Sequence, residues 1–490
     1  MLEPLPEPPL HARAEPPMLT SAGLILFAKV VVPAASFAIV YVLGLTRGVE
    51  PVGQFNTAMA VLSLFQIFGG LGLDSYLTRE TAQDPRTARD LFLRTARLVL
   101  AVSLVSMAAA VALTLLIGYD RTIVLATAVG SLSLAPFALL PLLDAVFIGL
   151  HRPRTVARVA LGENVIRLCL SLLVIWLRPH VVLLLLAHSL GKAAGLLFYW
   201  IPLGKLPRAR SRLESASALF RTVLPFVGIL LCYAVFWRLD VLLLSRLRGY
   251  HDAGLYSMGQ KVVMVFYLVP ASLVLATLPK LAAAFISDRD AFGALYRRTL
   301  SWLCFYVIPI TIILVFRGQD LFALLGLGDR WTSSGKAVTI LALLIPLMSF
   351  IEVSFRTMLA AGLERSALGV ALRSALACMI ILTPATYRYG WVGTAWAVVG
   401  AAAFDLAQDL WYVRRFVSGI AQVCARAALA ACALAGLMRL IVDYPLVIFL
   451  LVSGAAHLAL SCAVGLVKPR DLSNLLMRRR KTEVQLLPRE

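Results

Sequence analysis

Ionisable side chains stand inside long apolar stretches of this 490-residue chain. A charge at the centre of a membrane helix costs at least about 2.5–3.5 kcal/mol on insertion scales, so such residues are usually functional or paired. Cations in these positions suit the binding of an anion such as a phosphate group, whereas carboxylates suit coupling to protons or sodium ions. The cations are Lys29, Lys192, Arg238 and Arg356, and the other candidates are His188, Asp240, Glu352, Asp405 and Asp409.

Arg238 is the best candidate for a phosphate ligand, because a guanidinium stays charged and can hold two phosphate oxygens at once. Asp240 follows two residues later, about 200° around a helix, so these two side chains do not pair with each other. A hydrogen bond to another helix and a part in proton coupling both remain open for Asp240. Lys29 lies four residues before Pro33. It fits either a cation in a transport path or a lysine that extends to the membrane surface.

His188 and Lys192 are four residues apart and therefore share a helical face. Lys192 lies about 15–18 Å from either end of its apolar stretch at 1.5 Å per residue, too deep to reach the membrane surface easily. We expect Lys192 to face a transport path, with a structural hydrogen bond as the alternative. His188 is of the type that titrates near neutral pH, although a lone histidine also serves as a packing residue.

The carboxylates form two groups. Glu352 and Arg356 are at positions i and i+4 with the acid first, which favours a pair that neutralises itself; a pair that opens and closes during transport is the alternative. Asp405 and Asp409 share a face with Gln408 and would suit proton or sodium coupling. Alternatively, Asp409 is simply hydrated near the membrane surface.

The elements that carry these residues are predicted from hydropathy. Hydrophobic residues make up 60% of the chain and charged residues 15%, against roughly 45–50% and 25% in soluble domains. We therefore predict an all-α polytopic membrane protein. Apolar runs long enough to cross about 30 Å of hydrocarbon recur about fourteen times. They lie near Gly23–Leu45, Asn56–Tyr76, Leu98–Ile117, Ile123–Ile148, Ala160–Leu177, Val181–Leu203, Val223–Ser245, Leu255–Leu278, Leu300–Leu321, Ala337–Ala360, Ala367–Thr386, Trp391–Tyr412, Ala427–Val442 and Leu446–Val467.

Thirty Lys and Arg residues, Arg167 among them, fall in one alternate set of loops or at the helix ends beside them, and eleven, Lys261 among them, fall in the opposite set. Positive residues accumulate in cytoplasmic loops, so both termini are expected in the cytosol. This distribution explains the net charge of +20. The chain shows no pattern typical of nucleic-acid binding.

No enzymatic activity, cofactor or metal site is expected. The seven cysteines are scattered without a C-x-x-C pair, so they indicate neither a disulfide framework nor a metal site. The loops are short and carry neither nucleophile–base spacing nor a Gly-rich phosphate loop.

Two short motifs suggest an internal repeat. Val52-Gly53-Gln54-Phe55 opens the second span and Ala253-Gly254-Leu255-Tyr256 opens the eighth, six spans later. An even offset indicates parallel repeats about an axis along the membrane normal, with the substrate path at their interface. Glycine is also common at helix ends, which is the alternative explanation.

The predicted parts follow from this repeat. They are a disordered cytosolic tail (1–20), an N-lobe with spans one to six (21–203), a cytosolic linker (204–222), a C-lobe with spans seven to twelve (223–412), two additional spans (413–467) and a basic cytosolic tail (468–490).

Several motifs at helix starts and ends carry a family resemblance: Gly53-Gln54-Phe55, Gly70-Leu71-Gly72-Leu73-Asp74, Arg79-Glu80-Thr81-Ala82, Asp240 with Gly254-Leu255-Tyr256-Ser257, Met358-Leu359-Ala360-Ala361-Gly362 and Tyr389-Gly390-Trp391-Val392-Gly393-Thr394-Ala395. In this order, over about residues 20–465, the chain resembles the multidrug/oligosaccharidyl-lipid/polysaccharide exporter superfamily, and within it the Wzx-type flippases of lipid-linked oligosaccharides.

The resemblance implies two six-helix lobes plus two C-terminal helices, alternating access, and a polyprenyl-pyrophosphate-linked oligosaccharide as cargo in the bacterial inner membrane. Its pyrophosphate is expected to bind Arg238, Lys192, Lys29 and Arg356. Possible ion-coupling residues are Asp405, Asp409, Asp240, Glu352 and His188. The expected partners are this lipid-linked cargo, membrane lipid, and a polysaccharide polymerase with its export machinery.

Four alternatives remain open. A lipid II flippase shares the same fold and charge logic. A drug/cation antiporter of this superfamily should have an acid in its first lobe, where the first span has Lys29 instead. A membrane glycosyltransferase or polymerase should have a sizeable loop with clustered polar residues. A non-transporting scaffold of an export machine would tolerate replacement of Arg238 or Lys192.

Overall fold

The computed structural model describes residues 18–70, 73–178, 180–207, 236 and 238–467, without the side chains of 18–32, 70 and 75. These residues form helices and short turns, with no strand among them. Residues 236 and 238–248 are helical. The remaining elements are α1 (Met18–Arg47), α2 (Val49–Gly70), α3 (Leu73–Gln83), η1 (Pro85–Thr87), α4 (Ala88–Ile117), α5 (Arg121–Ser131), α6 (Leu134–Gly149), α7 (Pro153–Leu177), α8 (Val181–Gly204), α10 (Tyr250–Ser287), α11 (Arg289–Leu324), η2 (Asp329–Trp331), α12 (Thr332–Leu341), α13 (Leu344–Ala360), α14 (Glu364–Val413), α15 (Ile420–Leu440) and α16 (Leu446–Ala463).

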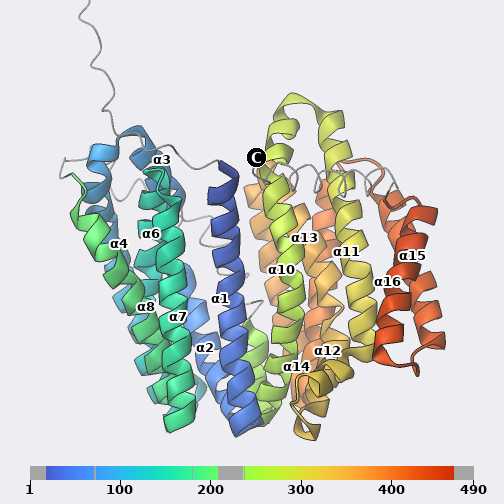
Figure 1. The fold of residues 1–490 in the computed structure, drawn as a ribbon, viewed down its shortest axis with the longest axis horizontal. Helices are drawn as coiled ribbons and strands as arrows, with labels where there is room; N and C mark the ends of the chain where they lie inside the picture. Colours follow the sequence, from blue (N-terminus) through green and yellow to red (C-terminus); the bar gives the residue numbers. More distant parts are fainter. Residues whose placement is uncertain (1–17, 71–72, 179, 208–235, 237, 468–490) are drawn as a thin grey trace, which may run out of the picture.

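The fold is that of an all-α polytopic membrane protein (Figure 1). Within the described ranges, ten helices are long and apolar enough to cross a membrane, and the bent pair of η2–α12 and α13 makes an eleventh candidate. The long α14 contains two predicted spans, separated at Gly390, whose φ of 59° and ψ of −140° are not helical. Most of the predicted seventh span, Val223–Ser245, lies outside the described residues, as do 1–17 of the predicted N-terminal tail, the predicted C-terminal tail and most of the predicted linker. Residues 18–20, predicted as part of the disordered tail, are helical.

One predicted boundary is wrong. The second span was expected near Asn56–Tyr76, but α2 already begins at Val49. Residues 71–72, between α2 and α3, are outside the described ranges. Glu50 and Gln54 lower the hydropathy of the first turns of α2, so the apolar run starts later than the helix itself.

Proline breaks two spans at corresponding places. The break between α5 and α6 begins at Leu132, four residues before Pro136. The break between α12 and α13 begins at Ala342, four residues before Pro346, and bends the chain by 42°. A proline has no N–H to donate to the carbonyl four residues earlier, so each break falls where that hydrogen bond is lost.

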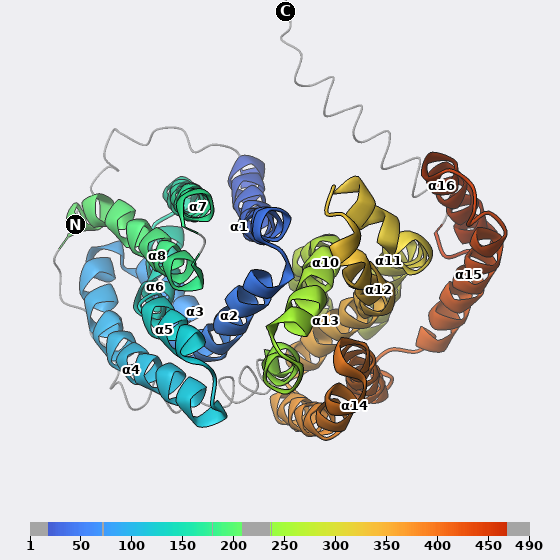
Figure 2. The same cartoon turned by 90° about the horizontal axis from the view of Figure 1, so that it is seen from below.

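The helices form two groups, an N-terminal group of α1–α8 and a C-terminal group of residues 238–248 with α10–α16 (Figure 2). The two groups meet where α2 packs on α10. A Cβ at Gly53 would lie 2.9 Å from the Gly254 nitrogen, and a Cβ at Gly254 would lie 3.1 Å from the Gly53 nitrogen. The contact is therefore reciprocal, as at an interface with twofold symmetry.

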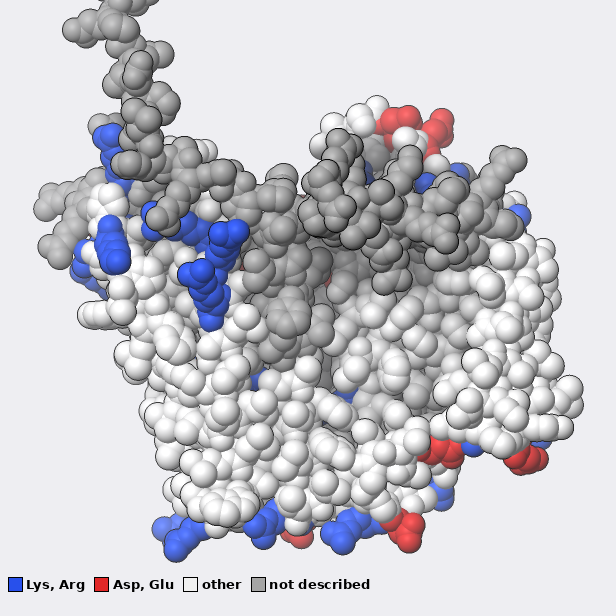
Figure 3. All heavy atoms as spheres, in the orientation of Figure 1, with Lys and Arg blue, Asp and Glu red and all other residues white. Residues whose placement is uncertain are grey.

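The surface has the charge distribution of a membrane protein. Among the described residues, charged side chains gather along the upper and lower edges of the face in Figure 3, and few lie in the band between them. Large apolar side chains are exposed over much of the molecule, including Leu104 (64%), Ile380 (73%) and Leu451 (70%). An apolar surface this extensive requires lipid around it.

Candidate functional site

A cavity of about 110 Å³ lies between the two helix groups. Among the described residues, three cations line it: Arg167 from α7, Arg238 from the helix at 238–248 and Lys261 from α10. No acidic side chain is among its described lining residues. The other lining residues are Ser36, Ile39, Phe55, Asn56, Met59, Ser63, Gln66, Ser171, His188, Val241, Ser257 and Gln260.

The three cations lie at similar depths. Arg167 precedes the end of α7 by ten residues, Arg238 precedes the helix end at Arg248 by ten, and Lys261 follows the start of α10 by eleven. At 1.5 Å per residue, each is about 15–17 Å from the same end of the molecule. That is about half the thickness of a bilayer core, so the cations meet near the middle of the membrane.

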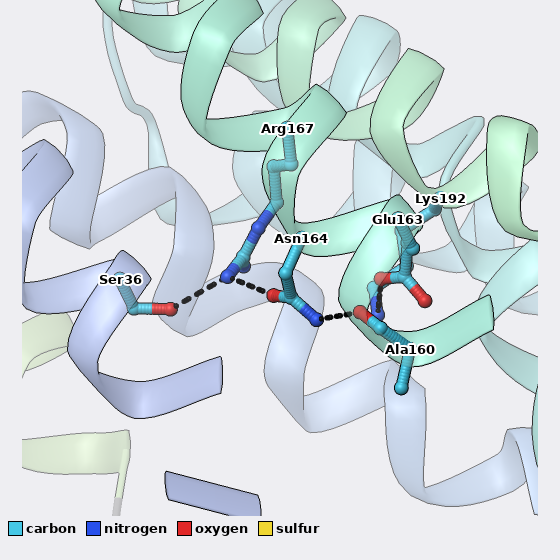
Figure 4. Close-up of polar contacts among 6 residues, drawn as sticks. All are labelled: Ser36, Ala160, Glu163, Asn164, Arg167 and Lys192. Atoms are coloured by element: carbon cyan, nitrogen blue, oxygen red, sulfur yellow. Dashed lines mark hydrogen bonds and ion pairs between the residues drawn. The ribbon is translucent and has the colours of Figure 1, made fainter. Parts of the chain in front are cut away.

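Arg167 connects α7 to α1 (Figure 4). Its Nη2 donates to Asn164 Oδ1 at 2.7 Å and to Ser36 Oγ at 3.2 Å. Asn164 is held in turn by donating to the Ala160 carbonyl at 2.7 Å. Behind Arg167, α8 approaches closely because Gly191 has no side chain: a Cβ there would lie 2.6 Å from Arg167 Cβ. Close packing thus directs the arginine away from α8.

Arg238 is exposed, and it forms part of the cavity wall. Asp240 points elsewhere, as the spacing predicts, and is fully buried. Its carboxylate accepts hydrogen bonds from Tyr256 Oη at 2.6 Å, Gln260 Nε2 at 3.0 Å and the Val241 N–H at 2.7 Å. Asp240 therefore joins the helix at 238–248 to α10 and anchors the helix that carries Arg238.

The sequence prediction missed Arg167 and Lys261 as cavity residues and assigned them to helix ends. Their depth in the spans was available as a signal: Arg167 lies seven residues inside Ala160–Leu177, and Lys261 lies six residues inside Leu255–Leu278. Each also has polar neighbours on the same side of its helix, Ser171 for Arg167 and Ser257 for Lys261. Arg167 and Lys261 therefore lie inside spans, and the orientation prediction was wrong to count them as loop charges.

Lys192 does not line the cavity. Its ammonium group forms an ion pair with Glu163 of α7 and lies 5.4 Å from the centre of the Phe137 ring. His188, one turn earlier on α8, is buried and does line the cavity. Of the two residues expected to share a helical face, His188 therefore lines the cavity, whereas Lys192 is held in an ion pair.

Glu352, Arg356, Asp405 and Asp409 are not among the described lining residues of the cavity. Arg356 pairs with Glu352 through Nε at 2.6 Å. Asp405 and Asp409 are buried in α14, with relative exposures of 1% and 0%. The backbone of Lys29 lies in α1, but its side chain is outside the described residues.

Hydrogen bonds join the two groups at the end of the molecule where α2 and α10 begin, the lower end in Figure 1. Tyr119 Oη lies 2.9 Å from the Leu242 carbonyl and 2.8 Å from Ser245 Oγ. Burial of this phenol raises the pKa of Tyr119 to about 12, so it stays neutral and can donate. Arg246 Nε donates to the Ile117 carbonyl at 2.8 Å. These contacts close the lower end between α4–α5 and the helix at 238–248.

Comparisons with known proteins agree with this fold. Residues 18–285 match the family described as polysaccharide biosynthesis protein. The inward closed conformation of the lipid II flippase MurJ is 14% identical, with a TM-score of 0.72, over 93% of this chain and 99% of that one. The MATE multidrug transporter DinF-BH is 15% identical, with a TM-score of 0.61, over 82% and 96%. An inward-facing multidrug resistance MATE family transporter of the MOP superfamily is 14% identical, with a TM-score of 0.63, over 80% and 98%. A sequence search of curated proteins found no match.

Proposed function

The chain belongs to the polysaccharide biosynthesis protein family, in the multidrug/oligosaccharidyl-lipid/polysaccharide exporter superfamily, and on this basis we propose that it flips a polyprenyl-pyrophosphate-linked oligosaccharide. The observation that carries the proposal is the meeting of Arg167, Arg238 and Lys261 in one cavity between the helix groups. Three cations with no acid among the described lining residues repel one another and favour an anion of high charge, such as pyrophosphate.

Each cation has a distinct part in this proposal. The guanidinium groups of Arg167 and Arg238 bind phosphate oxygens bidentately, and the ammonium group of Lys261 adds a point charge. His188 lines the same cavity and supplies a polar contact. Lys192 and Arg356, which have carboxylate partners in this state, are not assigned a direct phosphate contact.

The cargo moves by alternating access. A cavity of about 110 Å³ is smaller than the roughly 300–1,000 Å³ of sites for drug-sized ligands, so this state is a contracted one. The reciprocal packing of Gly53 and Gly254 supports two lobes related by an axis along the membrane normal. With both termini in the cytosol of a bacterial inner membrane, the closed lower end faces outward. The glycan head group then enters from the cytosolic side, while its lipid tail stays in the bilayer.

The charge of the cavity also separates this proposal from its rivals. A cationic drug would be repelled by three cations at close range. Lipid II is the remaining rival, because its head group is an anionic pyrophosphate too. The flipped product would feed a polysaccharide polymerase and its export machinery.

Flipping by the purified protein in vesicles tests the proposal. Arg238→Ala and Lys261→Ala should each lower the flipping rate about 10- to 100-fold, because a charge-assisted hydrogen bond contributes about 1.5–3 kcal/mol. Lys336→Ala removes an exposed cation from α12 and should leave the rate unchanged. Unchanged flipping by both cavity variants at normal abundance would reject the pyrophosphate role. Lipid II and a cationic dye, offered separately, identify the rival transporters.

A further inference from the structure

Resting on this proposed function, we infer that Lys192 is a positioning residue: it holds the Glu163 carboxylate and so keeps Arg167 directed into the cavity for the pyrophosphate. Glu163 precedes Arg167 by four residues on α7, so both side chains lie on one face. Glu163 is also on the favourable N-terminal side for an ion pair with Arg167. Without another partner, this carboxylate would compete with the cargo for the arginine.

The structure shows what holds Glu163 instead. Lys192 of α8 pairs with Glu163, and the two side chains are only 14% and 7% exposed. The ring of Phe137, 5.4 Å away, adds a cation–π contact on the lysine. Gly195 leaves room for the carboxylate, since a Cβ there would lie 3.3 Å from Glu163 Oε2. Three elements, α6, α7 and α8, thus fix this ion pair.

Arg167 points away from the Glu163–Lys192 pair (Figure 4). Its guanidinium extends to Asn164 and to Ser36 of α1, and it forms part of the cavity wall. The two ends of a possible Glu163–Arg167 pair are therefore held apart by partners on different helices. Lys192 acts through Glu163 and needs no contact with the cargo.

Removal of the lysine charge should release this arrangement. A buried carboxylate without a counter-ion is strongly unfavourable, and Arg167 is the cation four residues away on the same face. In Lys192→Met we expect Glu163 to pair with Arg167 and to draw it from the cavity. The dissociation constant for inorganic pyrophosphate should then rise by about tenfold or more.

A double-mutant cycle on the purified full-length protein tests this inference, with inorganic pyrophosphate as the probe and calorimetry as the measurement. Lys192→Met should weaken binding, and Glu163→Gln should tighten it, because a negative charge near the anion is removed. Lys192→Met combined with Glu163→Gln should restore binding to within about threefold of the unaltered protein. Lys192→Arg, which keeps the ion pair, should also retain binding.

The outcomes separate this inference from the proposed function. If the double variant binds as weakly as Lys192→Met, the lysine contacts the anion directly and the inference is wrong. If neither Arg238→Ala nor Lys261→Ala affects pyrophosphate binding, the cavity is not the anion site and the proposed function fails first. If Lys192→Met binds like the unaltered protein, Glu163 does not compete for Arg167. Lys205→Met, which removes an exposed cation just after α8, is the matched control.

Discussion

The N-terminal group and the long helix α14 of the C-terminal group bury their carboxylates in different ways. In the N-terminal group, Glu163 is paired with Lys192, and Asp144 accepts a hydrogen bond from Tyr199. In the C-terminal group, Asp405 accepts one hydrogen bond, from Ser374 at 2.6 Å. Its second oxygen and both oxygens of Asp409 have no hydrogen-bond partner in the described part of the chain.

This difference indicates separate tasks. A buried carboxylate with a counter-ion is neutralised in place and serves the geometry around it, as Glu163 does beside Arg167. Asp405 and Asp409 are neighbouring buried carboxylates with one described donor between them, so they cannot both remain ionised without a proton or cation. We therefore propose Asp405 and Asp409 as the candidates for ion coupling, with the N-terminal group and the cavity as the candidates for cargo binding.

The largest expected effect comes from breaking the paired arrangement. Glu163→Ala leaves the Lys192 ammonium group buried without its partner and should lower the free energy of unfolding by about 3–5 kcal/mol. Thermal unfolding of the detergent-solubilised protein measures this loss. Glu80→Ala, which removes the carboxylate of the exposed pair with Arg79, is the control and should cost about 0–1 kcal/mol. Equal losses in both variants would show that burial of the Glu163–Lys192 pair adds nothing to its contribution to the free energy of unfolding.

The opposite sign is expected in the C-terminal group. Asp409→Leu replaces a buried carboxylate that lacks a described partner with an apolar side chain of similar size, and should raise the free energy of unfolding by about 1–3 kcal/mol. The flipping rate should at the same time become indifferent to a proton gradient across the vesicle. Asp409→Asn keeps a polar group and should stabilise less. A stabilised variant that still responds to the gradient would exclude Asp409 from coupling.

The smallest effect is expected at the pair of Glu352 and Arg356, whose side chains are 25% and 31% exposed. Arg356→Ala should change the free energy of unfolding by about 0–1 kcal/mol, because solvent screens a partly exposed pair. The flipping rate should stay within about twofold of the unaltered protein. A loss as large as that of Arg238→Ala would show that the pair opens during transport and that Arg356 binds cargo.

Several features were predictable because they depend on local physics. Hydropathy alone identifies the membrane class and the order of the spans, since every backbone group in lipid must be satisfied within a helix. The two-residue spacing predicts that Arg238 and Asp240 point in different directions. In the folded protein Arg238 lines the cavity, whereas Asp240 accepts a hydrogen bond from Tyr256. The motif at Gly53 and Gly254 points to two positions that turn out to touch.

The meeting of side chains from different helices was not predictable in the same way. Depth along a span follows from the 1.5 Å rise per residue, so Arg167 and Lys261 had a readable signal. The rotation of one helix against another has no such signal in the sequence, because it is set by close packing such as that of Gly191 against Arg167. That packing is what gives Lys192 a carboxylate on α7 and withdraws it from the cavity.

The sequence by itself thus determined that this chain spans a membrane many times, that its cations exceed its acids, and that Arg238 stands deep in an apolar helix. The tertiary structure decided which cations lie together. Arg167, Arg238 and Lys261 share one cavity, whereas Lys192 is neutralised by Glu163. The physical reason is that hydropathy and helical pitch are properties of one segment, while a binding cavity depends on how several segments pack against one another.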